Sequence, residues 1–420
     1  MSDIKWYSSL PAHWEKQRTK YLFKIISGNG FPVEMQGRIG EKYPFAKAGT
    51  ISSSQRYLKK ANDSVSQDDV NANGFNVIPV GSIVMPKIGE ALKKNSRAVT
   101  SEEVCIDNNC QAMVPQNIDT DFAFYLLSVI DMNWYDNKGT IPSVNNQSLK
   151  NDKVPYPPLA EQHAIVRYLD SKCAAIDEAI ERHKKIIEKL EEYRKNEISY
   201  LSTKGLGDEP LKDSNTAWYG LIPQTWEVKR FKYIAQVKSN LVDPEPYLKY
   251  PQIGPDIIEK DSGRLIGYRT VEEAGIISGN HLFYEGQLLY SKVRPALNKV
   301  VTAPFDGLCS ADMYPIETSI NSDYLKYLML SNPFLEQASI IAMIRVKMPK
   351  INQEELANII CVVPPVEQQT QVVESIKKMC EKVQSAIDKH KTVIAKLEEY
   401  HKSIIYNAVT GKIDCRTEAS

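Results

Sequence analysis

Few groups in this 420-residue sequence have the type and spacing that covalent chemistry would need. Seven cysteines are scattered along the chain, an odd number that predicts no disulfide framework and favours a reducing compartment. Cys105 and Cys110 are too isolated for a zinc site, which needs four ligands. We therefore expect inert, buried thiols and no metal site.

Motifs for nucleotide binding and methyl transfer are missing as well. The sequence has no GxxxxGK[ST] loop for ATP, and the GNG turn at Gly28 lacks the rest of a dinucleotide fingerprint. An amino-methyltransferase needs a glycine-rich cofactor turn and an Asn/Asp-Pro-Pro-aromatic motif. The nearest match, SNPF at Ser331–Phe334, has one proline and is interpreted as the start of a helix. The sequence predicts neither catalysis nor a cofactor in this chain.

Composition narrows the class of protein further. Hydrophobic residues make up 42%, and no apolar run reaches the length of a membrane span or a signal peptide. A cytoplasmic protein without a membrane segment is expected. The 52 basic residues equal the 52 acidic ones, which argues against a protein that neutralises DNA phosphates without help from partners.

The dominant feature of the sequence is internal repetition. The segment WYSSLPAHWEKQRTKY from Trp6 returns as WYGLIPQTWEVKRFKY from Trp218. Three more pairs follow in the same order: GSIVMPKIGEALKK with GQLLYSKVRPALNK, PSVNNQSLKN with PKINQEELAN, and PPLAEQHAIV with PPVEQQTQVV. The chain is therefore a tandem duplication. Residues 28–80 and 236–285 do not align, so they are interpreted either as surfaces adapted to different targets or as loops that have drifted.

Each half is expected to contain a compact α/β domain followed by one long helix. Short apolar runs bounded by Gly, Pro and Asn are typical of strands and turns. From Ala160 to Lys204 there is neither Pro nor Gly, while Pro158 precedes this stretch and Gly205 follows it. At 1.5 Å per residue the helix would span roughly 65 Å, too long for burial in one small domain, so the two helices are expected to pack together as a spacer.

Apolar residues recur in both helices at alternating steps of four and three, which predicts a coiled-coil seam. The predicted seam residues are Leu169, Ile176, Ile180, Ile187 and Leu190, and in the second copy Ile376, Val383, Ile387, Ile394 and Leu397. His183 and His390 fall on equivalent seam positions. A polar pair that fixes the register is the favoured interpretation, and a metal or switch role is the alternative.

The duplicated order of these motifs resembles the specificity subunits of type I restriction-modification systems over essentially the whole chain. Each half has a Trp-x4-Pro-x2-Trp entry, a globular region, a Pro-Pro helix start with Glu-Gln or Gln-Gln, and a Lys-Leu-Glu-Glu-Tyr helix. The resemblance implies two target-recognition domains, each reading half of a bipartite double-stranded DNA sequence, and an antiparallel coiled coil that binds two modification subunits. It also implies restriction/translocase subunits, with S-adenosylmethionine, ATP and Mg held by the partner subunits. A non-enzymatic coiled-coil scaffold that binds protein or RNA is the alternative.

The resulting domain assignment has four parts. They are a first target-recognition domain at 1–156, a central helix at 157–205, a second target-recognition domain at 206–363, and a C-terminal helix and tail at 364–420.

Candidate DNA contacts are basic and amide side chains that follow the repeated strands and the PSVNNQSLKN and PKINQEELAN blocks. Arg can fork onto guanine, Asn can pair with adenine, and Lys mostly holds phosphates. The predicted residues are Lys87, Lys93, Lys94, Arg97 and Lys138 in the first half, and Lys292, Arg294, Asn298, Lys299, Arg345, Lys347 and Lys350 in the second. Arg294 aligns with Gly89, which favours readout by one half only. Weaker candidates are Gln55, Arg56, Arg264 and Arg269.

Overall fold

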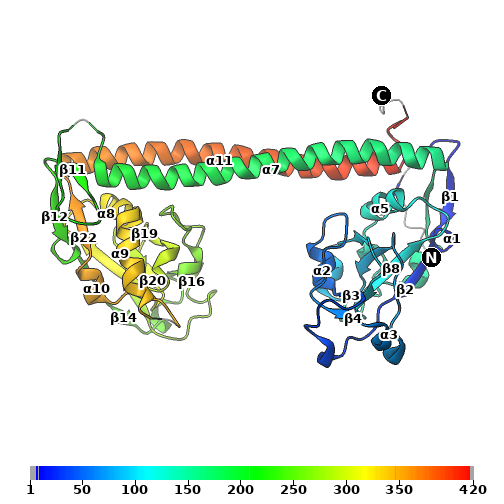
Figure 1. The fold of residues 1–420 in the computed structure, drawn as a ribbon. Coiled ribbons are helices and arrows are strands. Elements are labelled where there is room, and N and C mark those ends of the chain that lie inside the picture. The colour runs from blue at the N-terminus through cyan, green and yellow to red at the C-terminus, as the bar shows by residue number, and fades with distance from the viewer. Residues whose placement is uncertain (1–5, 8, 208, 346, 417–420) are drawn as a thin grey trace. The chain divides into compact units, whose positions relative to one another are not determined.

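The computed structural model describes residues 6–7, 9–207, 209–345 and 347–416, so the ends of the predicted domains 1–156 and 364–420 lie partly outside the described residues. The chain divides into two compact units, which are residues 1–181 with 393–420, and residues 182–392. Each unit contains a globular head and segments of two long helices (Figure 1). In the described ranges, no helix combines the length and apolar character needed to cross a membrane.

The first head is built from two sheets and a two-stranded ribbon. The four-stranded antiparallel sheet has the order β2-β8-β5-β6, at Phe23–Ser27, Cys110–Pro115, Ile83–Pro86 and Ala98–Val99. The three-stranded sheet has the order β4-β3-β7, at Ser64–Val65, Tyr43–Ala46 and Cys105–Ile106, with β3 and β7 parallel. The ribbon pairs β1 (Glu15–Arg18) with β9 (Lys153–Tyr156). The α-helices are α1 Thr19–Leu22, α2 Ala48–Ser53, α3 Gln67–Asn73, α4 Glu90–Lys93, α5 Thr120–Val129 and α6 Asn146–Asn151, and the 3-10 helices are η1 Val33–Met35 and η2 Met132–Tyr135.

The second head repeats this plan with a larger second sheet. Its four-stranded antiparallel sheet has the order β13-β21-β18-β19, at Ala235–Val237, Met313–Thr318, Leu288–Ser291 and Val300–Thr302. Its five-stranded sheet has the order β14-β17-β20-β15-β16, at Leu241–Val242, Asn280–Phe283, Gly307–Cys309, Pro251–Ile253 and Arg269–Thr270. Two ribbons pair β12 (Glu227–Arg230) with β22 (Ile360–Val363), and β10 (Leu211–Asp213) with β11 (Leu221–Pro223). The helices are α8 Ser322–Leu330, α9 Asn332–Met343 and α10 Gln353–Ala357, with η3 Phe231–Tyr233, η4 Glu245–Tyr247, η5 Pro255–Ile257 and η6 Pro295–Leu297.

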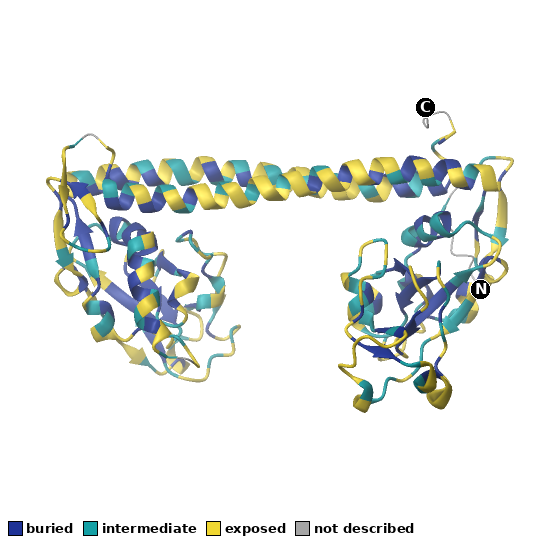
Figure 2. Cartoon of the chain, in the orientation of Figure 1, coloured by how far each residue is buried: buried dark blue, intermediate teal, exposed yellow. Residues whose placement is uncertain are grey.

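The four-stranded sheets show the duplication directly. Ile83 lies opposite Met113 in the first head, and its repeat partner Leu288 lies opposite Ile316 in the second. All residues of β5 and β18 are buried, because alternate side chains enter two different cores, one on each face of the sheet. Figure 2 shows the buried strands inside each head. The heads differ mainly in the second sheet, which lies largely in the stretches that did not align. The predicted fold class, two α/β heads in a duplicated chain with long helices, is confirmed.

Two long helices, α7 (Leu159–Lys204) and α11 (Val366–Val409), pack against each other in both units. In the first unit, Leu169 and Ile176 near the start of α7 share a core with Ile404 and Ala408 near the end of α11. In the second unit, the end of α7 meets the start of α11 through Ile198, Val372 and Ile376. The pairing is therefore antiparallel. The predicted seam residues are buried or half-buried along both helices, and His183 Nδ1 lies 2.7 Å from His390 Nδ1 within the second unit.

Hydrogen bonds from two repeated motifs join each head to the start of its long helix. One motif is the Trp of the entry segment, and the other is the Glu-Gln or Gln-Gln pair at the helix start. Trp14 donates its indole N–H to Glu161 at 2.9 Å, and Trp226 donates to Gln368 at 2.7 Å. The next residue, Gln162 or Gln369, donates to a proline carbonyl before the helix and accepts the backbone N–H of the residue that precedes α5 or α8. These buried amides satisfy backbone groups at element ends that would otherwise lack partners.

Shortening Ile404 tests whether the first head needs the C-terminal helix. Ile404 is 2% exposed in the core of the first unit, so Ile404→Ala should cost about 2–4 kcal/mol by leaving a cavity. Hydrogen exchange measured by mass spectrometry should quicken in peptides of the first head and stay unchanged in the second. Val393→Ala, at a position that is 37% exposed on the same helix, is the control and should change neither. Equal quickening in both heads would contradict this assignment.

Candidate nucleic-acid interface

The segment after β18 lies beside a second basic segment from later in the chain. Arg294 donates its backbone N–H to Pro349 O at 2.7 Å, and Ile351 donates to Lys292 O at 3.0 Å. These bonds hold residues 292–294 against residues 349–351. The two groups of predicted DNA contacts in the second half therefore form one surface, which we call the second basic loop pair.

The first head has the same arrangement. Gly89 donates its backbone N–H to Pro142 O at 2.8 Å, and Val144 donates to Lys87 O at 2.9 Å. Residues 87–97 and 138–144 form the first basic loop pair. Because the same backbone bonds recur at equivalent positions, the scaffold of the repeat, rather than its variable part, builds these loop pairs.

The predicted side chains differ in how far they reach solvent. The exposed ones are Lys93, Lys94 and Lys138 in the first loop pair, and Arg294, Lys347 and Lys350 in the second. Lys87, Lys292, Lys299 and Arg345 are half-buried. Of these, Lys292 lies over the Tyr314 ring, Lys299 donates to Pro255 O, and Arg345 is paired with Glu355 at 2.7 Å. Burial lowers the pKa of Lys87, although Cys110 and Asp107 oppose this shift. The exposed residues are the ones placed to meet a ligand.

Two of the predicted DNA contacts are wrong because their side chains are used inside the heads. Arg97 is 7% exposed and donates to Asn95 O at 2.7 Å and to Ile130 O. Its burial lowers its pKa to about 10, a shift that Asp131 only partly offsets. Asn298 is 1% exposed and donates to Asp261 Oδ1 at 2.8 Å and to Leu330 O at 3.0 Å. Both side chains satisfy buried carbonyl groups, and neither faces solvent.

The variable-region arginines are also engaged within their own units. Arg56 contacts Asp121 at 2.6 Å and Asp170 at 2.5 Å. Arg264 donates to Gln384, and Arg269 lies 3.3 Å from Asp256. The weak prediction that Arg56 reads DNA is therefore replaced by a structural contact between the variable region and α7.

Arg294 has the most informative backbone in either loop pair. It adopts the left-handed region with φ 50°, where its repeat partner is Gly89 with φ 76°. A residue with a Cβ pays roughly 1–2 kcal/mol in this conformation. Strained backbone of this kind is typical of functional sites. The guanidinium of Arg294 is exposed and is the candidate functional group at this position.

Sequence reasoning missed an exposed apolar patch beside the second loop pair. Met343, Ile344 and Met348 are 68%, 80% and 56% exposed, and α9, which ends at Met343, packs against η6, which follows Arg294. Apolar side chains next to an arginine can contact thymine methyl groups in the major groove. The run of apolar residues up to Met348 was the available signal, but it is also typical of a helix core.

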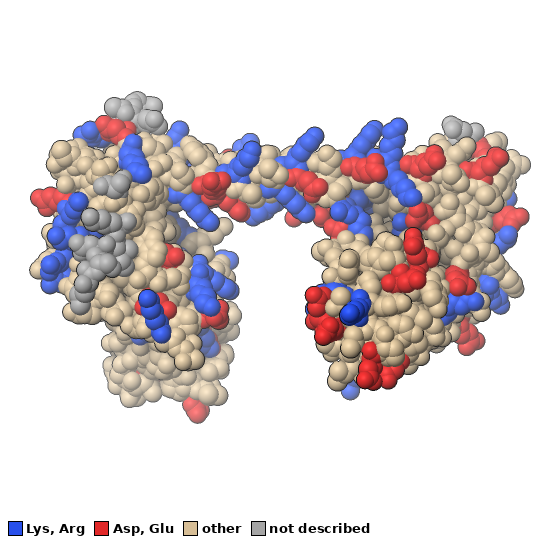
Figure 3. Space-filling model, turned by 180° about the vertical axis from the view of Figure 1, so that it is seen from behind, with Lys and Arg blue, Asp and Glu red and all other residues tan. Residues whose placement is uncertain are grey.

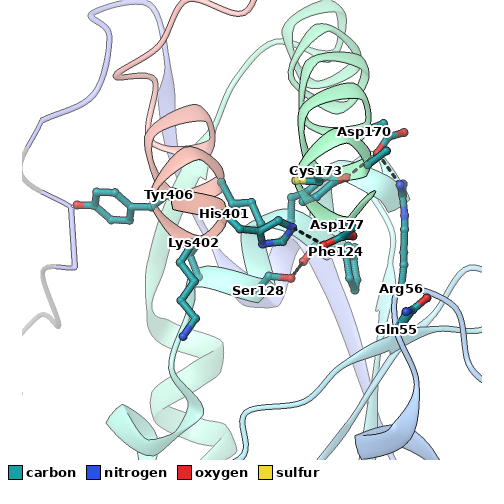
Figure 4. Close-up of a pocket in the computed structure, with 14 residues that line it drawn as sticks. Gln55, Arg56, Phe124, Ser128, Asp170, Cys173, Asp177, His401, Lys402 and Tyr406 are labelled. Carbon is teal, nitrogen blue, oxygen red and sulfur yellow. Dashed lines mark hydrogen bonds and ion pairs between the residues drawn. The ribbon is translucent and has the colours of Figure 1, made fainter. Parts of the chain in front are cut away.

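No nucleophile or metal centre stands out among the residues described. The cysteines there are free and mostly buried, and burial raises the pKa of Cys105 to about 12. The described part of the chain has no group of three His, Cys, Asp or Glu side chains placed to hold a metal. A pocket of about 800 Å³ in the first unit is lined by residues of α5, α7, α11 and Gln55–Arg56 (Figure 4). Arg56 pairs with Asp170 in this pocket, and His401 Nε2 lies 3.9 Å from Asp177.

Comparison with known proteins agrees with this architecture. Residues 11–192 match the model of the type I restriction modification DNA specificity domain. The EcoDI specificity subunit of Escherichia coli is 30% identical over 323 residues, which cover 73% of this chain and 72% of that protein. The MjaVIII specificity subunit of Methanocaldococcus jannaschii is 24% identical over 429 residues, covering 96% and 94%.

Solved structures share the fold. A chain from a study of complex assembly and conformational transition in the type I R-M system has a TM-score of 0.65 at 15% identity, covering 97% of this chain and all of that one. The HsdS subunit from Thermoanaerobacter tengcongensis has a TM-score of 0.51 at 14% identity, covering 97% and 99%. The matched domain model and the relatives place the chain in the class of DNA-specificity proteins. The chain belongs to the specificity subunits of type I restriction enzymes.

Replacing Arg294 by Gly tests the backbone strain. Arg294→Gly should stabilise the second unit by up to about 1 kcal/mol, because glycine adopts φ 50° without strain, although its freedom in the unfolded chain offsets part of the gain. Urea unfolding of the purified chain measures the change. Arg294→Ala is the matched control, since it removes the same charge but keeps a Cβ, and it should not stabilise. Equal effects of the two substitutions would show that the backbone of Arg294 is unstrained.

Proposed function

We propose that each head reads one half of a bipartite DNA target through its basic loop pair. The observation that carries this proposal is the repetition of the loop pair on a shared scaffold, with different variable sheets beside it. The shared part would place both heads on DNA in the same way. The variable sheets, which differ between the heads, would make the two half-sites differ in sequence.

Within each loop pair, we assign base reading and phosphate binding to different side chains. Arg294 has the fork geometry for guanine O6 and N7, and its repeat partner Gly89 cannot supply the same contact. Lys93, Lys94 and Lys138, and Lys347 and Lys350 in the second head, are exposed ammonium groups suited to phosphates. The apolar side chains of Met343 and Ile344 add a surface for thymine methyl groups in the second half-site.

The paired helices are proposed to bind two modification subunits, with restriction/translocase subunits joining that complex. Their outer faces carry many Lys and Arg side chains with Asp and Glu among them (Figure 3), a surface suited to a charged protein partner. S-adenosylmethionine, ATP and Mg would be held by those partner subunits. The modification subunits would also supply much of the phosphate clamp, which fits a chain with no net charge.

The first test is methylation by the chain with and without a modification subunit. The complex should methylate one split DNA sequence, while the chain alone with S-adenosylmethionine should not methylate any. In the complex, Arg294→Ala should relax recognition of the second half-site only, costing about 1–3 kcal/mol at the base that it contacts. Sequencing of methylated bases in a randomised library reads both half-sites separately. Relaxation of both half-sites would contradict the assignment of Arg294 to one head.

A second test separates phosphate contacts from base contacts. Lys350→Ala should weaken binding to all sequences alike and should reduce the slope of log Kd against log salt by about 0.9, the value for one phosphate contact. Fluorescence anisotropy of the complex on cognate and unrelated DNA at several salt concentrations measures both quantities. Lys326→Ala, at a lysine buried on Asp323, is the control and should leave the slope unchanged. A sequence-dependent loss for Lys350→Ala would make this residue a base reader instead.

A further inference from the structure

Arg56 joins the variable region of the first head to the long helix α7. It lies between α2 and β6, and its backbone is held by Val99 N–H donating to Arg56 O at 2.8 Å. Its side chain reaches Asp121 of α5 at 2.6 Å. It also reaches Asp170 of α7 at 2.5 Å (Figure 4). Tyr125 also donates to Asp170, at 2.6 Å. A residue from the stretch that differs between the halves thus contacts two elements of the shared scaffold.

The guanidinium of Arg56 is largely sheltered from solvent. Its side chain is 22% exposed, and its carbon Cζ lies 5.3–5.7 Å from the ring centres of Tyr57, Phe124 and Tyr125. Burial alone would lower the pKa of Arg56, but the hydrogen bond that Arg56 donates to Asp121 and the charges of both aspartates raise it. Two carboxylates that would repel each other are therefore bridged by one cation in an aromatic surround.

The second head neutralises the equivalent position by a different route. Asp323 takes the place of Asp121 in the repeat, and it contacts Lys377 of α11 at 2.5 Å and Lys326 of α8 at 2.8 Å. Lys377 occupies the helix position that Asp170 occupies in the first half. Burial opposes ionisation of Asp323, but the charge of Lys326 and hydrogen bonds from Lys326, Lys377 and Thr302 outweigh it and hold the pKa at about 2. In the second head, the cations come from the repeated elements, with Lys326 on α8 and Lys377 on α11.

The two halves therefore carry opposite charges at one equivalent helix position, and only the first half needs a cation from its variable region. In the first half, Phe124 stands at the position of Lys326, and Asp170 stands at the position of the helix lysine. At these two positions α5 and α7 therefore provide no cation, and Arg56 pairs with both Asp121 and Asp170. The cation therefore comes from the variable region of the first head.

We propose that Arg56 is a positioning residue for recognition of the first half-site: it fixes residues 54–58 of the variable region on α7 through Asp170. This proposal rests on the bipartite reading proposed above. It also states a compatibility rule: a variable region placed on this first scaffold must bring a cation to Asp121 and Asp170, or the helix must carry a lysine at position 170.

The test is an exchange of the charge arrangement between the two halves. Arg56→Gln should quicken hydrogen exchange in residues 54–58 and reduce discrimination against mismatches in the first half-site by about tenfold, because small misplacements of a recognition surface weaken it strongly. The second half-site should be read as before. Arg56→Gln combined with Asp170→Lys gives Asp121 a cation from the helix, as Lys377 does for Asp323 in the second head. It should recover the part of both losses that comes from two carboxylates left without a cation. Arg38→Gln removes an arginine that pairs with Asp69 inside the variable region, at 3.4 Å, and should leave exchange in residues 54–58 unchanged.

The outcomes separate this proposal from the function on which it rests. Unchanged exchange in residues 54–58 for Arg56→Gln would overturn the positioning role, whatever the complex does with DNA. The same role is overturned if the double variant is no better than Arg56→Gln alone in either readout. If the wild-type complex fails to methylate a split sequence, the bipartite function fails instead, while the exchange measurements on the full chain still decide whether Arg56 holds the variable region on α7.

Discussion

The antiparallel pairing of α7 and α11 is the constraint on which the remaining structure depends. Each head completes its core with a helix end from the other repeat: Ile404 and Ala408 of α11 enter the first core, and Ile198 of α7 enters the second. The glycines that end the two helices show how close this fit is. Gly205 and Gly411 both have φ 71°, and a Cβ at either position would lie 3.1 Å from the ring of Trp226 or Trp14, respectively. Neither repeat is therefore a self-contained domain.

Because each core contains helix residues from the other repeat, some elements must be the same in both halves while others can differ. The helices, the four-stranded sheet and the Trp and Gln contacts must match one another in both halves. Gln162 and Gln369 bond to backbone groups at fixed places, and Trp14 and Trp226 donate to side chains at the helix starts. The second sheet makes few of these bonds, and it has three strands in one head and five in the other. The basic loop pairs lie on the fixed part, so the reading surface can change without loss of its placement.

Periodicity and repetition predicted the fold well because both are properties of the sequence itself. The helix expected from Ala160 begins at Leu159 and ends at Lys204 as expected. The candidate site was harder, since burial depends on contacts that no local pattern contains. Arg97 and Asn298 have charged neighbours in the sequence. Their side chains nevertheless donate hydrogen bonds to the carbonyls of Ile130 and Leu330 inside the heads. The contact of residues 292–294 with residues 349–351 joins distant segments, which no local pattern could predict. The alignment of Arg294 with Gly89 suggested a difference between the two halves but gave no indication of the backbone conformation of Arg294.

Internal pairing of arginines limits the number of cations that this chain of zero net charge can offer to DNA. Arg56, Arg97 and Arg345 are committed to carboxylates or carbonyls within their own units, which leaves six exposed cations among the predicted contacts, three in each loop pair. In the proposed function, Arg294 reads a base and the five exposed lysines hold phosphates, which would give a salt slope of about −4.5. Modification subunits bound to the helices would add further phosphate contacts, so the contribution of this chain would lie mainly in the choice of sequence.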